Sequence, residues 1–213
     1  MTNATCPIES GEPDEPLVIQ AADSRVAAAI AMWIFSLIWN GVIGLVFLFA
    51  NIGPGFFPML FSTVFGLIGI AILVFAIYCT MQIFNPRPIL ICSQRDIYPG
   101  SEFELSWVFR GNSKKIQSMS IVLEGIESVT YRQGTSTRTE TVNFLEKKVM
   151  ESSVCTTIQQ GFELISLPVT TMHSFKSSNN AFTWQIRVFG KIALWPDIND
   201  RFEIIVLTPK SVT

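Results

Sequence analysis

Side chains that could support chemistry are few in this sequence. His173 is the single histidine, and the four cysteines are Cys6, Cys79, Cys92 and Cys155. A site built from several histidines is therefore excluded, and the cysteines show no CxxC or comparable ligand spacing. We expect no metal site and no cofactor.

Catalytic arrangements are equally poorly supported. A Ser-His-Asp triad would have to use His173, which Ser174 follows, yet the chain has no Gly-Xaa-Ser-Xaa-Gly elbow, no GxGxxG and no Walker loop. We interpret His173 as a polar loop residue. Glu102 and Glu104 stand on one face of an expected strand, which is typical of a charged surface or a protected sheet edge. We therefore expect a protein that is not an enzyme; the enzyme alternative would need a cleft around His173.

Charge patterning argues against nucleic acid as a partner. The net charge is −2, and 15% of the residues are charged. Nucleic-acid binding usually requires a basic stripe with accessible aromatic side chains. Lysines stand singly or in pairs, such as Lys114 with Lys115 and Lys147 with Lys148. These pairs are solvated surface, or they contact anionic headgroups if the domain lies against a membrane.

Hydrophobicity is concentrated in the first part of the chain. The hydrophobic fraction is 49% and the mean hydropathy +0.40. No charged residue occurs between Arg25 and Arg87, which predicts spans over residues 26–50 and about 57–84. About 20 residues at about 1.5 Å each cross about 30 Å of hydrocarbon. The Asn-Ile-Gly-Pro-Gly-Phe turn at 51–56 makes the two helices antiparallel neighbours, a transmembrane hairpin.

The ends of this hairpin predict its orientation. Arg25 precedes it, Arg87 and Arg95 follow it, and the turn has no basic residue, so both termini should be cytoplasmic. Sparse cysteines after residue 84 fit a reducing compartment. We expect an integral protein with two spans in a bacterial inner membrane or a plasma membrane. The domains are a flexible acidic tail (1–25), the hairpin (26–84) and a cytosolic β domain (85–213).

Small and polar residues inside the spans predict a helix-packing or partner-binding face, formed by Ser36, Asn40, Gly41, Gly44, Gly66 and Gly69. Glycines one turn apart let helix backbones approach closely. Ser36 and Asn40 share a helix face, and an asparagine in lipid needs a hydrogen-bond partner. That partner is another protein's helix, or it lies within the hairpin. No ionisable residue lies at mid-membrane depth, so no ion or proton pathway is predicted.

The apolar periodicity changes to two after Pro86. Phe103, Leu105, Trp107 and Phe109 alternate with more polar residues, and the same alternation returns at 118–123 and 183–188. Gly- and Pro-containing turns separate these segments, and no βαβ alternation occurs. The fold class is therefore a membrane helical hairpin followed by an all-β domain, an antiparallel two-sheet β-sandwich of the immunoglobulin kind.

Five segments of this domain together resemble the arrestin-like sandwich, shared by arrestins and a related retromer subunit: residues 95–107, 121–132, 135–144, 161–175 and 181–188. The resemblance covers about residues 88–209 and implies one sandwich, whereas arrestins carry two. It implies a cytosolic protein-binding module, often an adaptor. Receptor-binding and phosphate-sensing residues are not carried over, and the membrane hairpin departs from soluble arrestins.

We therefore expect a membrane-anchored, non-catalytic binding or accessory subunit, which presents a cytosolic β-sandwich to a protein partner. Exposed strand edges could bind that partner by β-augmentation. The alternative is a structural subunit of a larger membrane complex, packed through its helical hairpin and identified by tight packing at Gly41, Gly44 and Asn40.

Overall fold

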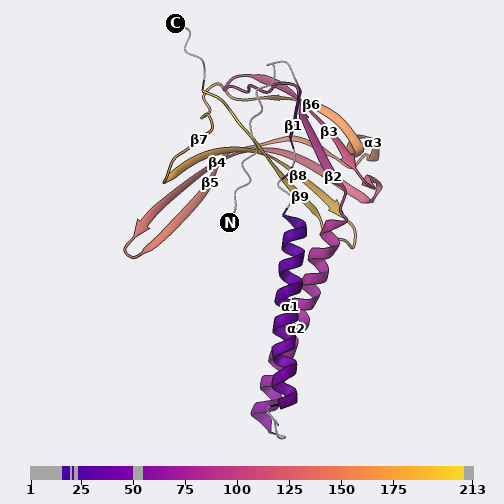
Figure 1. Ribbon diagram of the computed structural model, residues 1–213. Coiled ribbons are helices and arrows are strands. Elements are labelled where there is room, and N and C mark those ends of the chain that lie inside the picture. The colour runs from indigo at the N-terminus through magenta and orange to yellow at the C-terminus, as the bar shows by residue number, and fades with distance from the viewer. Residues whose placement is uncertain (1–15, 20, 22–23, 50–54, 209–213) are drawn as a thin grey trace. The chain divides into compact units, whose positions relative to one another are not determined.

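The computed structural model describes residues 16–208, apart from 20, 22–23 and 50–54. The chain divides into two compact units (Figure 1). The helical unit comprises residues 23–85 together with the short segment Leu194–Ile198. The β unit comprises the described residues before position 23, Pro86–Ala193 and those from Asn199 onward.

Two long helices dominate the helical unit: α1 (Arg25–Phe49) and α2 (Phe56–Ile83) lie side by side (Figure 1). Both are long and apolar enough to cross a membrane, as the sequence predicted. Within the protein, only 6% of the most apolar stretch of α1 and 11% of that of α2 is buried. The predicted turn at 51–56 lies largely outside the described residues.

One antiparallel sheet has the strand order β1-β2-β3-β6 and comprises β1 (Leu17–Ile19), β2 (Arg87–Cys92), β3 (Glu102–Arg110) and β6 (Gln160–Ser166). In β1, Val18 pairs with Ile91 of β2. The prediction of a flexible tail over residues 1–25 is thus wrong at Leu17–Ile19. Three residues are too few to show a period, and pairing with a distant strand orders them. Residues 1–15 of that tail lie outside the described part.

A larger sheet has the order β5-β4-β8-β7, with β9 also paired to β8. Its strands are β4 (Ile116–Gln133), β5 (Ser136–Ser152), β7 (Phe175–Lys176), β8 (Asn180–Ile192) and β9 (Ile198–Ile204). The long β4–β5 hairpin turns at Gly134, whose φ of 64° favours glycine. A 3₁₀ turn, η1 (Ser113–Lys115), and a short helix, α3 (Cys155–Gln159), complete the unit.

Each sheet has one buried apolar face. In the smaller sheet it includes Phe103, Leu105 and Trp107, and in the larger sheet it includes Trp184 and Ile186. This confirms the alternating strands and the antiparallel β class that the period of two predicted. Two buried indoles are also anchored by hydrogen bonds, because Nε1 of Trp107 donates to Thr157 O at 3.0 Å and Nε1 of Trp184 to Met172 O at 2.9 Å.

At two positions on these faces, aromatic rings occupy the space that any side chain larger than that of glycine would need. A Cβ added at Gly161 would lie 2.5 Å from the ring of Trp107, and one added at Gly125 would lie 2.5 Å from the ring of Phe144. Trp107 is buried, whereas Phe144 is partly exposed. The absence of a side chain at these positions therefore lets the rings lie flat against the strand backbone.

Candidate functional site

The helical hairpin packs through a seam that contains several small residues. The shielded positions of α2 include a row at alternating spacings of three and four residues: Ser62, Phe65, Gly69, Ile72, Ala76, Cys79 and Ile83. Gly66 and residues 80–82 are also partly shielded. On α1, the buried positions Ala29 and Ser36 are also small. This is the heptad-like period of two helices that cross at a small angle, and small side chains let the backbones approach.

Asn40 makes its hydrogen bonds inside this seam. Its Nδ2 donates to Ser36 O at 2.8 Å and reaches Ser36 Oγ at 3.3 Å and Gly69 O at 3.4 Å. Of the two alternatives that the sequence left open for Asn40, the structure realises the contact within the hairpin. Its amide nitrogen thus has acceptors within the hairpin.

The four predicted packing glycines have different surroundings in the structure. Gly69 lies directly against Asn40 and Trp39, so a Cβ there would collide with the Asn40 side chain. A Cβ added at Gly41, Gly44 or Gly66 would meet nothing within 4 Å. Within the hairpin, the seam therefore passes through Ser36, Asn40 and Gly69, and the role of Gly41, Gly44 and Gly66 as a partner face stays a prediction.

Tryptophans add polar bonds along the same seam. Trp33 Nε1 donates to Thr80 Oγ1 at 2.9 Å, and the Thr80 hydroxyl donates to Ala76 O at 2.9 Å. The Trp39 ring stacks on Phe65, with 5.8 Å between the ring centroids. Indole N–H groups need an acceptor where water is absent, and these bonds supply it.

A second cluster, which we call the helix-end cluster, forms where α2 ends. It comprises Arg25, Gln82, Asn85, Trp195 and Pro196, all within the helical unit. Arg25 Nη1 donates to Gln82 O at 3.4 Å. A cation is favourable there because the last carbonyls of a helix carry partial negative charge.

Asn85 holds the segment Leu194–Ile198 in this cluster. Its side chain is only 5% exposed. Its Oδ1 accepts from Trp195 Nε1 at 2.7 Å, and its Nδ2 donates to Pro196 O at 3.0 Å and reaches Asp197 O at 3.4 Å. One carboxamide thus binds a side chain and the main chain of a segment that lies 110 positions further along the sequence.

Sequence reasoning missed this cluster. Asn85 precedes a proline, which predicts a helix boundary, and the sequence Trp195-Pro196-Asp197 by itself predicts only a turn. No local pattern connects the two, since the hydrogen bonds are long-range.

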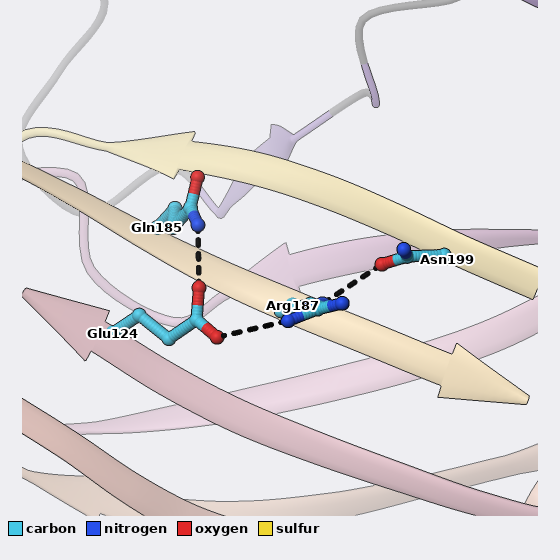
Figure 2. A network of polar contacts seen from close by, with 4 residues as sticks. All are labelled: Glu124, Gln185, Arg187 and Asn199. Carbon is cyan, nitrogen blue, oxygen red and sulfur yellow. Dashed lines mark hydrogen bonds and ion pairs between the residues drawn. The ribbon is translucent and has the colours of Figure 1, made fainter. Parts of the chain in front are cut away.

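In the β unit, the main polar network surrounds Glu124 (Figure 2). The side chain of Glu124 on β4 is largely buried, and its Oε2 accepts from Gln185 Nε2 on β8 at 2.5 Å. Its Oε1 lies 3.5 Å from Arg187 Nη1, and Arg187 Nε donates to Asn199 Oδ1 on β9 at 2.8 Å. Both carboxylate oxygens are occupied, so the network cross-links three strands and offers no free acid or base.

Ser174, which follows His173, is hydrogen-bonded to the backbone of Val206. Ser174 Oγ accepts from the backbone N–H of Val206 at 2.9 Å, and Ser174 N donates to Val206 O at 2.7 Å. Cys92 is fully buried, and desolvation raises the pKa of its thiol to about 12. Cys155 is exposed. Among the described residues, no three His, Cys, Asp or Glu side chains are grouped to hold a metal ion.

Exposed apolar side chains stand at both edges of the outer face of the smaller sheet, at Val18 on β1 and at Phe162 on β6. Val18, Ile91, Ser106 and Phe162 are paired in succession across β1, β2, β3 and β6. Phe162 is 68% exposed, and Leu164 on the same strand is 64% exposed. Strand β6 is terminal in its sheet, so these two side chains stand on a sheet edge. We call Phe162 and Leu164 the β6 edge pair.

Comparison with known proteins adds little to this geometry. No protein family matches the chain, and no curated protein matches it. Among solved structures, part of the chain is similar to Spo0M, a sporulation control protein from Bacillus subtilis, with a TM-score of 0.40 and 15% sequence identity. The match covers 57% of this chain and 49% of Spo0M, so this chain spans about half the length of that protein.

Proposed function

We propose that this protein is a membrane-anchored, non-catalytic accessory subunit that presents its β unit to a protein partner in the cytoplasm. The β unit would be a β-sandwich, formed by the buried faces of the two sheets, as the resemblance to arrestin-like domains implies. The β6 edge pair carries this proposal, because large exposed apolar side chains on a terminal strand are a ready site for an added strand.

The hydrophobic surface of the helices supports the anchor. Leu37, Leu48 and Met59 are each more than 70% exposed, and the seam covers little of the remaining apolar surface. Burying such a side chain is worth about 1.5–3 kcal/mol, so a surface of this size is stable only in lipid or against other helices.

Orientation follows from the positive-inside rule. Arg25 and Arg87 adjoin the same end of the hairpin, which favours a cytoplasmic β unit. An impermeant thiol reagent tests this on Cys155, in a Cys6→Ser variant. We expect labelling only after the cells are permeabilised, and labelling in intact cells would reverse the orientation. Cys92 is uninformative, because its buried thiol would not react on either side.

The partner is tested by mild-detergent purification of the tagged chain, followed by mass spectrometry. We expect a stoichiometric protein that is lost in the Phe162→Ser/Leu164→Ser variant. Val142→Ser is the matched control, since Val142 is 62% exposed on β5 of the other sheet. If the partner is still copurified with the doubly substituted chain, the β6 edge is not its binding site. Recovery of the chain alone, even after crosslinking in the membrane, would refute the accessory-subunit function.

A structural subunit is the second candidate, and one observation favours it. Gly41 and Gly44 are one turn apart on α1, and the space over both is open. Another protein's helix could approach closely there. In that case Gly41→Leu with Gly44→Leu would release the partner, whereas the β6 double substitution would not.

A further inference from the structure

Leu194 has an unusual backbone and an unusual exposure. Among the described residues it is the only non-glycine residue with a positive φ, at 56°. Its side chain is fully exposed, at 102%. Leucine is disfavoured in the left-handed region, where glycine and asparagine fit readily. The chain therefore holds a large apolar side chain in a strained backbone, and no contact within the protein compensates for it.

The helix-end cluster fixes where this leucine is held. Trp195 follows Leu194 directly, and its indole is bonded to Asn85 at the end of α2. Phe84, the residue before Asn85, is itself 74% exposed. The exposed residues Phe84 and Leu194 are thus the sequence neighbours of Asn85 and Trp195, which are hydrogen-bonded to each other. All four residues belong to the helical unit.

The length of α2 sets the depth of this pair. Its apolar stretch Met59–Ile83 has 25 residues. At about 1.5 Å per residue it measures about 37 Å, whereas the hydrocarbon core is about 30 Å thick. The last turn of α2 therefore lies in the headgroup region if the helix spans the membrane. Arg25, at the same end, is suited to that depth, since its guanidinium reaches polar groups from an apolar stem.

We infer that Leu194 and Phe84 form a lipid contact, inserted at the boundary between the headgroups and the acyl chains on the side of the chain termini. The inference rests on the proposed membrane anchor. Lipid is the occupant that the observations favour, because the pair continues the exposed apolar surface of α2 to its end. The strain at Leu194 is then compensated by removing its side chain from water.

Nitroxide labels in the full chain, reconstituted in phosphatidylcholine/phosphatidylglycerol vesicles, test this depth. Labels are placed singly at Leu194→Cys, Ile70→Cys and Leu164→Cys, with Cys6 and Cys155 replaced by serine. Ile70 is an exposed residue near the middle of α2, and Leu164 is an exposed residue of the β unit. Accessibility to oxygen and to a water-soluble nickel chelate is compared at each site.

We expect the oxygen-to-nickel ratio at position 194 to be severalfold above that at 164 and below that at 70. A ratio at 194 equal to that at 164, with a high ratio at 70, would overturn the lipid contact and leave the membrane anchor intact. A ratio at 70 equal to that at 164 would overturn the anchor itself. If position 194 is shielded from both reagents, a protein surface covers it, and the lipid contact is also refuted.

A label at Phe84→Cys measures the same surface if the Leu194 variant does not fold. We expect the same intermediate ratio there. Labelling of the buried thiols Cys79 and Cys92 would reveal an unfolded sample. A water-exposed label at 84, in a folded sample with a membrane-embedded label at 70, would refute the inference.

Discussion

Replacing Asn85 by alanine should detach the segment Leu194–Ile198 from the end of α2. The substitution removes the acceptor for Trp195 Nε1 and the donor for Pro196 O, whose distances are 2.7 and 3.0 Å. A buried donor left without a partner costs about 1–3 kcal/mol, and the released carbonyl adds about 1 kcal/mol, the net value of one hydrogen bond to a backbone acceptor that water can reach once the segment moves. We expect a total loss of about 2–4 kcal/mol in the local free energy of opening.

Solvent exchange of the Trp195 indole proton measures this loss directly, by nuclear magnetic resonance of the full chain in mild detergent. A loss of 2–4 kcal/mol corresponds to an exchange rate about 30 to 900 times faster. The Trp107 indole, bonded to Thr157 O in the β unit, is the internal control. Asn112→Ala is the matched variant, because Asn112 is exposed and makes one bond, at 3.3 Å, to the Lys114 N–H.

Two results would contradict this reasoning. An unchanged exchange rate at Trp195 would mean that Asn85 does not hold the indole. Equal acceleration at Trp195 and Trp107 would mean that the substitution unfolds the whole chain. A double-mutant cycle with Trp195→Phe adds a quantitative check, since two directly bonded residues should couple by about 0.5–3 kcal/mol.

Three other substitutions have expected outcomes. Leu194→Gly should change the free energy of unfolding in detergent by less than about 1 kcal/mol, because the about 1–2 kcal/mol of strain that glycine relieves at that φ is offset by the greater freedom of glycine in the unfolded chain and by the lost contact of the side chain with the micelle; a change of more than about 2 kcal/mol in either direction would refute this balance. As the pH rises from about 9 to about 12, the wild type should lose about 1.4 kcal/mol of stability per pH unit relative to Cys92→Ala. The reason is that the Cys92 thiol ionises in the unfolded chain, whereas burial keeps it protonated in the folded chain. Stability curves of the two proteins that run parallel over this pH range would refute the prediction. Gly161→Ala should lower the free energy of unfolding, measured with denaturant, by about 1–3 kcal/mol, and Gly125→Ala should lower it less. Trp107 over Gly161 is buried and cannot move aside, whereas Phe144 over Gly125 is partly exposed and can. Equal losses for the two substitutions would refute this reasoning.

The parts of the fold that depend on local pattern could be predicted from the sequence. A long run without charge predicts a helix whatever its neighbours are, and the expected spans match α1 and α2 to within a residue at their described ends. The alternation at Phe103–Phe109 likewise predicts β3, because the period of two is a property of the strand itself.

The parts that depend on long-range pairing could not be predicted. Asn85 and Trp195 are separated by 110 positions, and Glu124 and Gln185 by 61. No periodic sequence pattern links the two residues of either pair, and each residue alone is typical of a turn or an exposed strand. The glycines of the spans illustrate the same limit. Spacing identified Gly69 and Gly41 equally, but only the register of α1 against α2 places Gly69 in the seam.

The distribution of polar bonds in the hairpin indicates where specific recognition can occur. Asn40, Trp33 and Thr80 all have acceptors within the two helices, so the outward surface of the hairpin is apolar and has few directional groups. Apolar surface of this kind suits lipid, since hydrocarbon offers no hydrogen bonds to match. In the β unit, the Glu124 network is also satisfied internally. Strand β6 is terminal in its sheet and carries the exposed side chains of Phe162 and Leu164, while Ser166 O at its end already accepts from Lys147 Nζ at 3.1 Å. A partner that binds by strand pairing, as we propose, would therefore pair with the part of β6 before Ser166.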